Sequence, residues 1–150
     1  MRNEQYDVEM TSLFTAFEFI SEGKNGKIHK IIRYTEYEKS GVFNLGFGDK
    51  IGETDQFDDK TVTNNGDTEK VLATVAATIP KFLDEHPEAI IYVKGSSFSR
   101  TRLYRMRISN ALDEITKSYD VLGSLDDNWE RFRQNRDYSA FLITKKITVK

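Results

Sequence analysis

Apolar residues in the first third of the chain follow the two-residue spacing of β-strands. Residues 13–21 (LFTAFEFIS) are rich in phenylalanine and predict a well-buried strand. Asn25-Gly26 comes next and supplies the positive φ angles that a tight hairpin turn requires. Residues 27–38 predict the returning strand, and residues 42–48 alternate again between apolar and small or polar side chains. We therefore expect a three-strand antiparallel meander.

After a polar stretch, the spacing of apolar residues changes to that of a helix beginning near Asp67. Pro80 lies inside this pattern, so we expect a kink there or a break into two short helices. The residues that share the apolar stripe are Val71, Leu72, Val75, Ile79, Phe82 and Leu83.

Residues 89–95 (AIIYVKG) predict a compact strand in the centre of the sheet. Three serines that follow offer N-caps for a second helix, which we expect to run to about Lys117. Leu103 and Met106 lie opposite the apolar stripe of this helix, so either another part of the fold or a partner covers them. We expect strands at 119–123 and 138–144, separated by a polar connection over residues 129–136.

The predicted order of elements is β-β-β-α-β-α-β(β). Strands cluster early and helices follow without strict alternation, which favours an α+β fold: a mainly antiparallel sheet packed against two helices. We expect a single domain over residues 1–150, with its core at about 13–144 and frayed ends at 1–10 and 145–150.

Composition excludes several kinds of site and favours none. Lys and Arg total 22 against 24 Asp and Glu, so the net charge of −2 gives no general attraction to nucleic acid or membrane. The absence of cysteine excludes disulfides, thiolate catalysis, iron–sulfur clusters and cysteine-based zinc sites, and two histidines exclude a histidine-rich metal centre. We expect no cofactor, no metal site and no membrane partner. The polar, acidic first ten residues and the short uncharged run at 71–80 favour a cytoplasmic location.

Three segments together carry a resemblance: FEFISEGKNGKIHKIIRYTEY (17–37), NNGDTEKVLATVAATI (64–79) and IYVKGSSFSRTRLYRMRI (91–108). They resemble a family of small, single-domain bacterial proteins that is catalogued as a domain of unknown function. The resemblance implies a bacterial, intracellular, stand-alone domain. It implies no activity, cofactor or catalytic residue.

The segment from Lys94 to Arg107 is the first candidate for chemistry, since no acidic residue occurs from Ala89 to Leu112. Its serines precede a helix N-terminus, whose free N–H groups attract anions, and arginine adds bidentate contacts to phosphate or carboxylate. The alternative is that a serine is only a cap and that the arginines pair with acids elsewhere, for example in residues 49–69. The predicted anion-binding residues are Lys94, Ser96, Ser97, Arg100, Arg102 and Arg105.

Further polar groups have both a functional and a structural interpretation. A basic run on the predicted hairpin (Lys24, Lys27, His29, Lys30, Arg33) is typical of single-stranded nucleic-acid binding or of a solvated strand face. The residues Asn64, Asn65 and Asp67 form either a polar binding loop or ordinary turn and cap chemistry. The acids that offer Mg²⁺ ligands are Asp55, Asp58, Asp59, Asp67 and Glu69, with Lys60 or Lys70 nearby; a solvated acidic loop is their alternative.

Three functions follow from these groups. The first is a binding module that engages an anionic ligand, nucleic acid or an acidic protein through residues 94–107. The second is a small metal-dependent phosphoryl-transfer enzyme or a toxin-like RNA-acting protein that uses residues 55–69. The third is a homodimer or other interaction protein that uses Leu103 and Met106.

Overall fold

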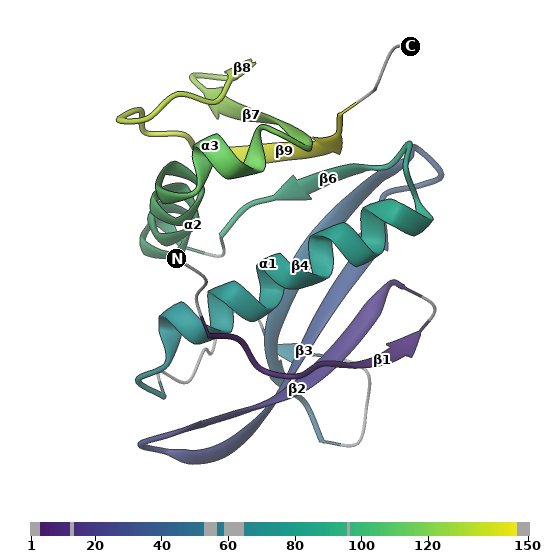
Figure 1. Ribbon diagram of the computed structural model, residues 1–150, viewed down its shortest axis with the longest axis vertical. Coiled ribbons are helices and arrows are strands. Elements are labelled where there is room, and N and C mark those ends of the chain that lie inside the picture. Colours follow the sequence, from purple (N-terminus) through teal and green to yellow (C-terminus); the bar gives the residue numbers. More distant parts are fainter. Residues whose placement is uncertain (1–3, 13, 53–56, 59–64, 96, 147–150) are drawn as a thin grey trace. The chain divides into compact units, whose positions relative to one another are not determined.

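The computed structural model describes residues 4–12, 14–52, 57–58, 65–95 and 97–146 (Figure 1). The chain separates into two compact units. Unit 1 comprises Met1–Thr35 and Gly46–Glu85, and unit 2 comprises Glu36–Leu45 and His86–Lys150. Each unit combines strands with at least one helix. The described fold is α+β with a mostly antiparallel sheet, as the sequence predicts.

The strands of unit 1 begin near the N-terminus and include a segment that the sequence did not indicate. They are hydrogen-bonded in the order β1-β2-β3-β4, with β5 on β4, which confirms the predicted meander. Residues 1–10, expected to fray, contain the start of β1, which pairs antiparallel with β2. The strand bounds are β1 Glu9–Ser12, β2 Ala16–Gly23, β3 Gly26–Glu36, β4 Val42–Lys50 and β5 Phe57–Asp58.

The hairpin between β2 and β3 closes one residue earlier than the sequence suggested. Gly23 and Gly26 are cross-strand partners, so Lys24 and Asn25 occupy the loop. Gly26 follows the loop and has a φ of +84°. The positive φ predicted for this glycine is thus confirmed, and glycine adopts it without strain.

Helix α1 (Thr68–Glu85) buries five of the six residues of its predicted stripe in the core of unit 1, and the sixth, Ile79, is half-buried. Tyr34 of β3 stacks on Phe82 with ring centroids 4.2 Å apart, and its hydroxyl shares a hydrogen bond of 2.7 Å with Thr78. Burial raises the pKa of this tyrosine. Val75 is buried on the same helix.

Of the two outcomes expected at Pro80, a kink or a break into two short helices, the break is wrong, because α1 continues through the proline to Glu85. A proline inside a helix removes one backbone N–H. Pro80 itself is exposed, whereas Thr78, Phe82 and Leu83 beside it are buried. The free energy gained by burying residues on both sides of the proline offsets the free energy of the lost hydrogen bond.

Unit 2 is built on strands in the order β4-β6-β9-β7-β8. β4 and β6 pair in parallel, and the remaining pairs are antiparallel. β8 overlaps the start of the segment 129–136, which we expected to be a connection. One face of these strands is fully buried at Ile91 and Phe141. The bounds are β6 Ile90–Val93, β7 Tyr119–Leu125, β8 Asn128–Arg131 and β9 Ala140–Lys145.

Helix α2 (Phe98–Asn110) ends earlier than predicted, and the short α3 (Leu112–Ile115) follows it. Ala111 separates them with a non-helical φ of −115°. α2 buries only Thr101 and Ile108, so one side of the helix is left largely exposed. Among the described residues, no helix is both long enough and apolar enough to cross a membrane.

Replacing Gly26 by Val should lower the free energy of unfolding by more than about 1 kcal/mol, because a β-branched residue is strained at positive φ. Gly26→Asn is the matched control, since asparagine tolerates this conformation. Urea denaturation followed by circular dichroism measures both. Equal losses for the two variants would contradict the backbone explanation.

Replacing the buried Val75 by Asp should cost more than about 3 kcal/mol, since the carboxylate would have to be buried unpaired or expose the core. Lys81→Asp, on the exposed side of the same helix, should cost less than about 1 kcal/mol. A folded Val75→Asp variant with near-normal stability would show that α1 does not pack as described.

Candidate functional site

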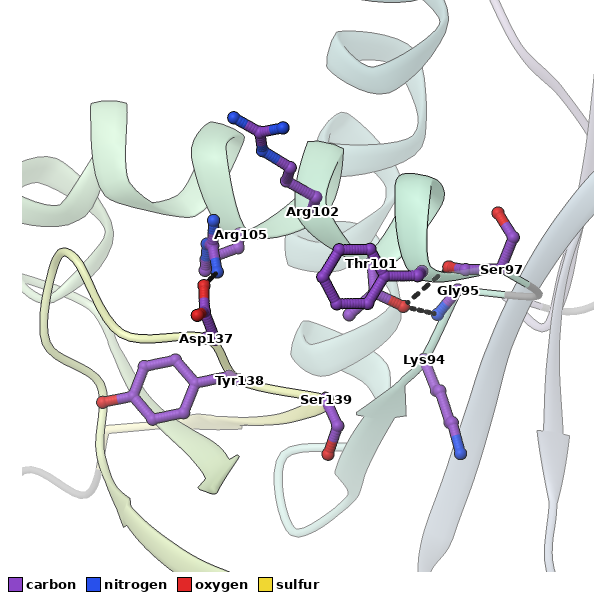
Figure 2. Close-up of a pocket in the computed structure, with 10 residues that line it drawn as sticks. Lys94, Gly95, Ser97, Thr101, Arg102, Arg105, Asp137, Tyr138 and Ser139 are labelled. Atoms are coloured by element: carbon purple, nitrogen blue, oxygen red, sulfur yellow. Dashed lines mark hydrogen bonds and ion pairs between the residues drawn. The ribbon is translucent and has the colours of Figure 1, made fainter. Parts of the chain in front are cut away.

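The end of β6 and the start of α2 approach each other so closely that only glycine fits at position 95. The backbone N–H of Gly95 donates to Thr101 Oγ1 at 3.0 Å, and the same hydroxyl donates to the carbonyl of Ser97 at 3.2 Å (Figure 2). A Cβ on Gly95 would lie 2.5 Å from the backbone nitrogen of Thr101. This contact fixes where the first turn of α2 begins.

Ser97 is the N-cap of α2, as the sequence predicts for one of three serines. Its Oγ accepts a hydrogen bond of 3.2 Å from the backbone N–H of Arg100. The first turn contains no acidic residue. The partial positive charge of the helix N-terminus is therefore reinforced by arginine rather than balanced by a carboxylate.

A pocket of about 340 Å³ opens beside this junction. Four of the six predicted anion-binding residues line it, namely Lys94, Ser97, Arg102 and Arg105. Arg100 is absent from the lining, and Ser96 lies outside the described residues. The remaining lining residues are Gly95, Phe98, Thr101, Asp137, Tyr138 and Ser139.

Arg105 is paired within the fold. Its guanidinium forms an ion pair with Asp137 (Figure 2). It also donates to the carbonyl of Arg136 at 3.3 Å. Arg105 therefore pairs with an acid of the fold, which was the structural alternative to anion binding. The acid, Asp137, belongs to the segment before β9 and not to residues 49–69. Sequence reasoning missed Asp137, since only the fold brings it to α2.

Lys94 and Arg102 are different, because neither forms a hydrogen bond or ion pair through its side chain within the described part of the chain. Both side chains are exposed. In Figure 2, Arg102 points away from Lys94 and from the Arg105–Asp137 pair. The positive charges are therefore spread along the junction instead of converging on one point, which suits an extended anionic partner better than a single small anion.

The far wall of the pocket is held rigidly by Tyr138. Its ring covers Gly123 so closely that a Cβ there would lie 2.4 Å from the ring. The hydroxyl donates to Glu130 at 2.9 Å and accepts from the backbone N–H of Arg133 at 3.0 Å. Burial, more than the nearby carboxylate, raises the pKa of Tyr138. The Tyr138 side chain is therefore a neutral phenol, and its two hydrogen bonds hold it in place in the wall of the pocket.

The predicted polar loop serves the fold of unit 1. Asn65 is buried, accepting from the N–H of Asn25 at 2.6 Å and donating to Ser21 at 3.1 Å and to the carbonyl of Gly26 at 2.9 Å. Asp67 accepts from Ser21 at 2.5 Å and from Tyr6 at 2.6 Å. These bonds tie the β2–β3 hairpin to the start of α1 and account for both residue types. Asn64 lies outside the described residues.

The basic run of the hairpin is divided between surface and interior. Lys30 has only 2% of its surface exposed, and its Nζ lies 2.5 Å from Asp49 Oδ1. Lys24, Lys27 and His29 are exposed, and Lys27 lies 3.8 Å from Glu22. The run therefore does not form one basic face.

The acidic stretch can be assessed only in part. Asp55, Asp59 and Lys60 lie outside the described residues, as does the side chain of Asp58. Within the parts of the chain that are described, no three His, Cys, Asp or Glu side chains are grouped so as to hold a metal ion.

Replacing Gly95 by Ala should lower the free energy of unfolding by more than about 1 kcal/mol, because the added methyl group meets the backbone of Thr101 rather than a flexible side chain. Ser99→Ala, at an exposed position of the same turn, should leave stability nearly unchanged. Thermal denaturation compares the two variants. A Gly95→Ala variant as stable as Ser99→Ala would show that the junction is looser than described.

Comparison with known proteins gives a family but no characterised relative. No curated protein and no solved structure shows a significant match to this chain. The family described as "Family of unknown function (DUF6934)" matches residues 2–146, which is nearly the whole chain. The resemblance carried by residues 17–37, 64–79 and 91–108 is thereby confirmed, and the chain belongs to Family of unknown function (DUF6934).

Proposed function

We propose that this protein is a binding module that engages an anionic ligand or an acidic partner through residues 94–107. The observation that supports the proposal most directly is the unneutralised charge of Lys94 and Arg102 at the start of α2. Backbone N–H groups and the helix dipole add to the same positive field.

The first turn of α2 departs from the charge pattern that stabilises a helix N-terminus. Helices gain about 0.3–1 kcal/mol from each acidic residue in the first turn and lose stability from basic ones there. α2 has arginine at position 100 in its first turn and at position 102 just beyond it, with no acid among residues 98–110. An arginine in the first turn of a helix that contains no acid departs from the usual charge pattern, and such departures are typical of functional surfaces.

The groups around the pocket favour binding over catalysis. Among the described residues that line it, Asp137 is the one carboxylate, and it is paired with Arg105. The Tyr138 hydroxyl is engaged by Glu130 and by the Arg133 backbone. For the alternative of a metal-dependent phosphoryl-transfer enzyme, the side chains of Asp55, Asp58 and Asp59 lie outside the described residues, and Asp67 accepts hydrogen bonds from Ser21 and Tyr6. From the resemblance and the absence of cysteine, we also propose a bacterial, cytoplasmic protein.

Replacing Lys94 and Arg102 together by Ala tests the proposal. Isothermal titration at low salt should show that poly-glutamate and tripolyphosphate bind the unmodified protein. The double variant should bind both at least about tenfold more weakly, because the anionic groups lose the cations that they pair with. Rising salt should weaken the binding as well.

Lys81→Ala with Lys117→Ala is the matched control, since it removes the same net charge from exposed positions elsewhere. It should change the affinity less than about twofold. Equal losses in both double variants would mean that only net charge matters, and the proposed site would then be wrong.

A further inference from the structure

We infer that the partner of α2 is an acidic polypeptide segment with apolar anchor residues, docked along the exposed side of the helix. The inference rests on the proposed function, because it names the partner class of the same basic segment. The surface concerned, called the α2 face below, consists of Phe98, Arg102, Leu103 and Met106.

The α2 face is apolar where a surface helix is ordinarily polar. Phe98 is 79% exposed, Leu103 38% and Met106 47%. Phe98, Arg102 and Met106 are spaced by four residues, so they follow one another along a single row, and Leu103 lies beside Met106. None of these three apolar side chains contributes to the described core, and together they form one exposed patch.

Charge decides which kind of partner fits this patch. Arg102 lies inside the apolar row and forms no side-chain hydrogen bond or ion pair within the described part of the chain, and residues 98–110 contain no acid. A complementary surface therefore has carboxylates placed around apolar side chains. Phenylalanine, methionine and arginine are also the residue types enriched at the centres of protein interfaces.

A second copy of this chain is a poorer occupant. Two-fold pairing would place one α2 face on another, because a two-fold interface uses the same patch on both copies. Each copy would then bring its Arg102 into an interface whose α2 faces contain no acid, and a charge buried without a partner in this way opposes association.

Nucleic acid also fits less well. Proteins that bind single strands stack successive bases on aromatic rings placed within a basic groove. The α2 face has one exposed ring, Phe98, while Leu103 and Met106 offer apolar surface without a ring. Contact with apolar side chains of another protein would bury the apolar surface of Leu103 and Met106 better than contact with nucleic-acid bases would.

The experiment uses three probes of matched length. The first is an acidic peptide of about 15 residues with leucines at helical spacing among glutamates, long enough to form a helix. The second is the same peptide with every leucine replaced by serine, and the third is oligouridine. Fluorescence anisotropy should show the leucine peptide binding at least about tenfold more tightly than the serine peptide.

Leu103→Ser with Met106→Ser should abolish most of this preference and leave the affinity for the serine peptide unchanged. Both positions are exposed, so the variant should keep the circular dichroism spectrum and stability of the unmodified protein. Lys94→Ala with Arg102→Ala should weaken binding of both peptides.

The outcomes separate this inference from the proposed function. Equal affinity for the two peptides, tighter binding of oligouridine than of the leucine peptide, or a dimer that buries Leu103 and Met106 would each overturn the inference. In the first two cases, sensitivity to Lys94 and Arg102 would leave the proposed function standing. Failure of every acidic probe to bind would overturn both.

Discussion

The close approach of Gly95 to Thr101 is the constraint on which the account of this protein depends. It attaches the end of β6 to the start of α2 through the hydrogen bond that the Gly95 N–H donates to the Thr101 hydroxyl, which in turn donates to the carbonyl of the N-cap Ser97. Ile108 and the Arg105–Asp137 pair hold the same helix further along. Because the attachment uses one side of α2, the side that carries Arg102 and Met106 is left exposed. The local geometry of one glycine thus determines which charges are available for binding.

In unit 1, by contrast, the polar residues singled out from the sequence bond to other parts of the fold. Asn65 and Asp67 direct their hydrogen bonds inward to the hairpin and to Tyr6, and Lys30 is buried against Asp49. A buried polar group without a partner would cost free energy, and these residues are each satisfied within the fold. The two basic runs of the sequence therefore differ: the one on the hairpin is partly structural, and the one on α2 remains largely at the surface.

The sequence predicts elements whose signal is local. The two-residue spacing of β2 and β3, the positive φ at Gly26, the helical stripe of α1 and the serine cap of α2 all depend on neighbouring residues. The sequence placed Phe82 and Leu83 on the apolar stripe but left a kink or a break at Pro80 open, because the stabilisation that the burial of these two residues gives to the helix is tertiary. The same holds for the site: the cap and the arginine-rich helix are visible in sequence, whereas the Asp137 partner and the Tyr138 wall depend on the folding of a distant segment.

The central claim is that an acidic partner binds the basic segment of α2, and mapping the backbone amides tests it most directly. A ¹H–¹⁵N correlation spectrum recorded during titration with the leucine-bearing acidic peptide reports which amides change their surroundings. The account predicts shifts concentrated in residues 94–107 and near Asp137, with the hairpin around Lys24 and Lys27 unaffected. Shifts concentrated on the hairpin, with residues 94–107 unchanged, would contradict it.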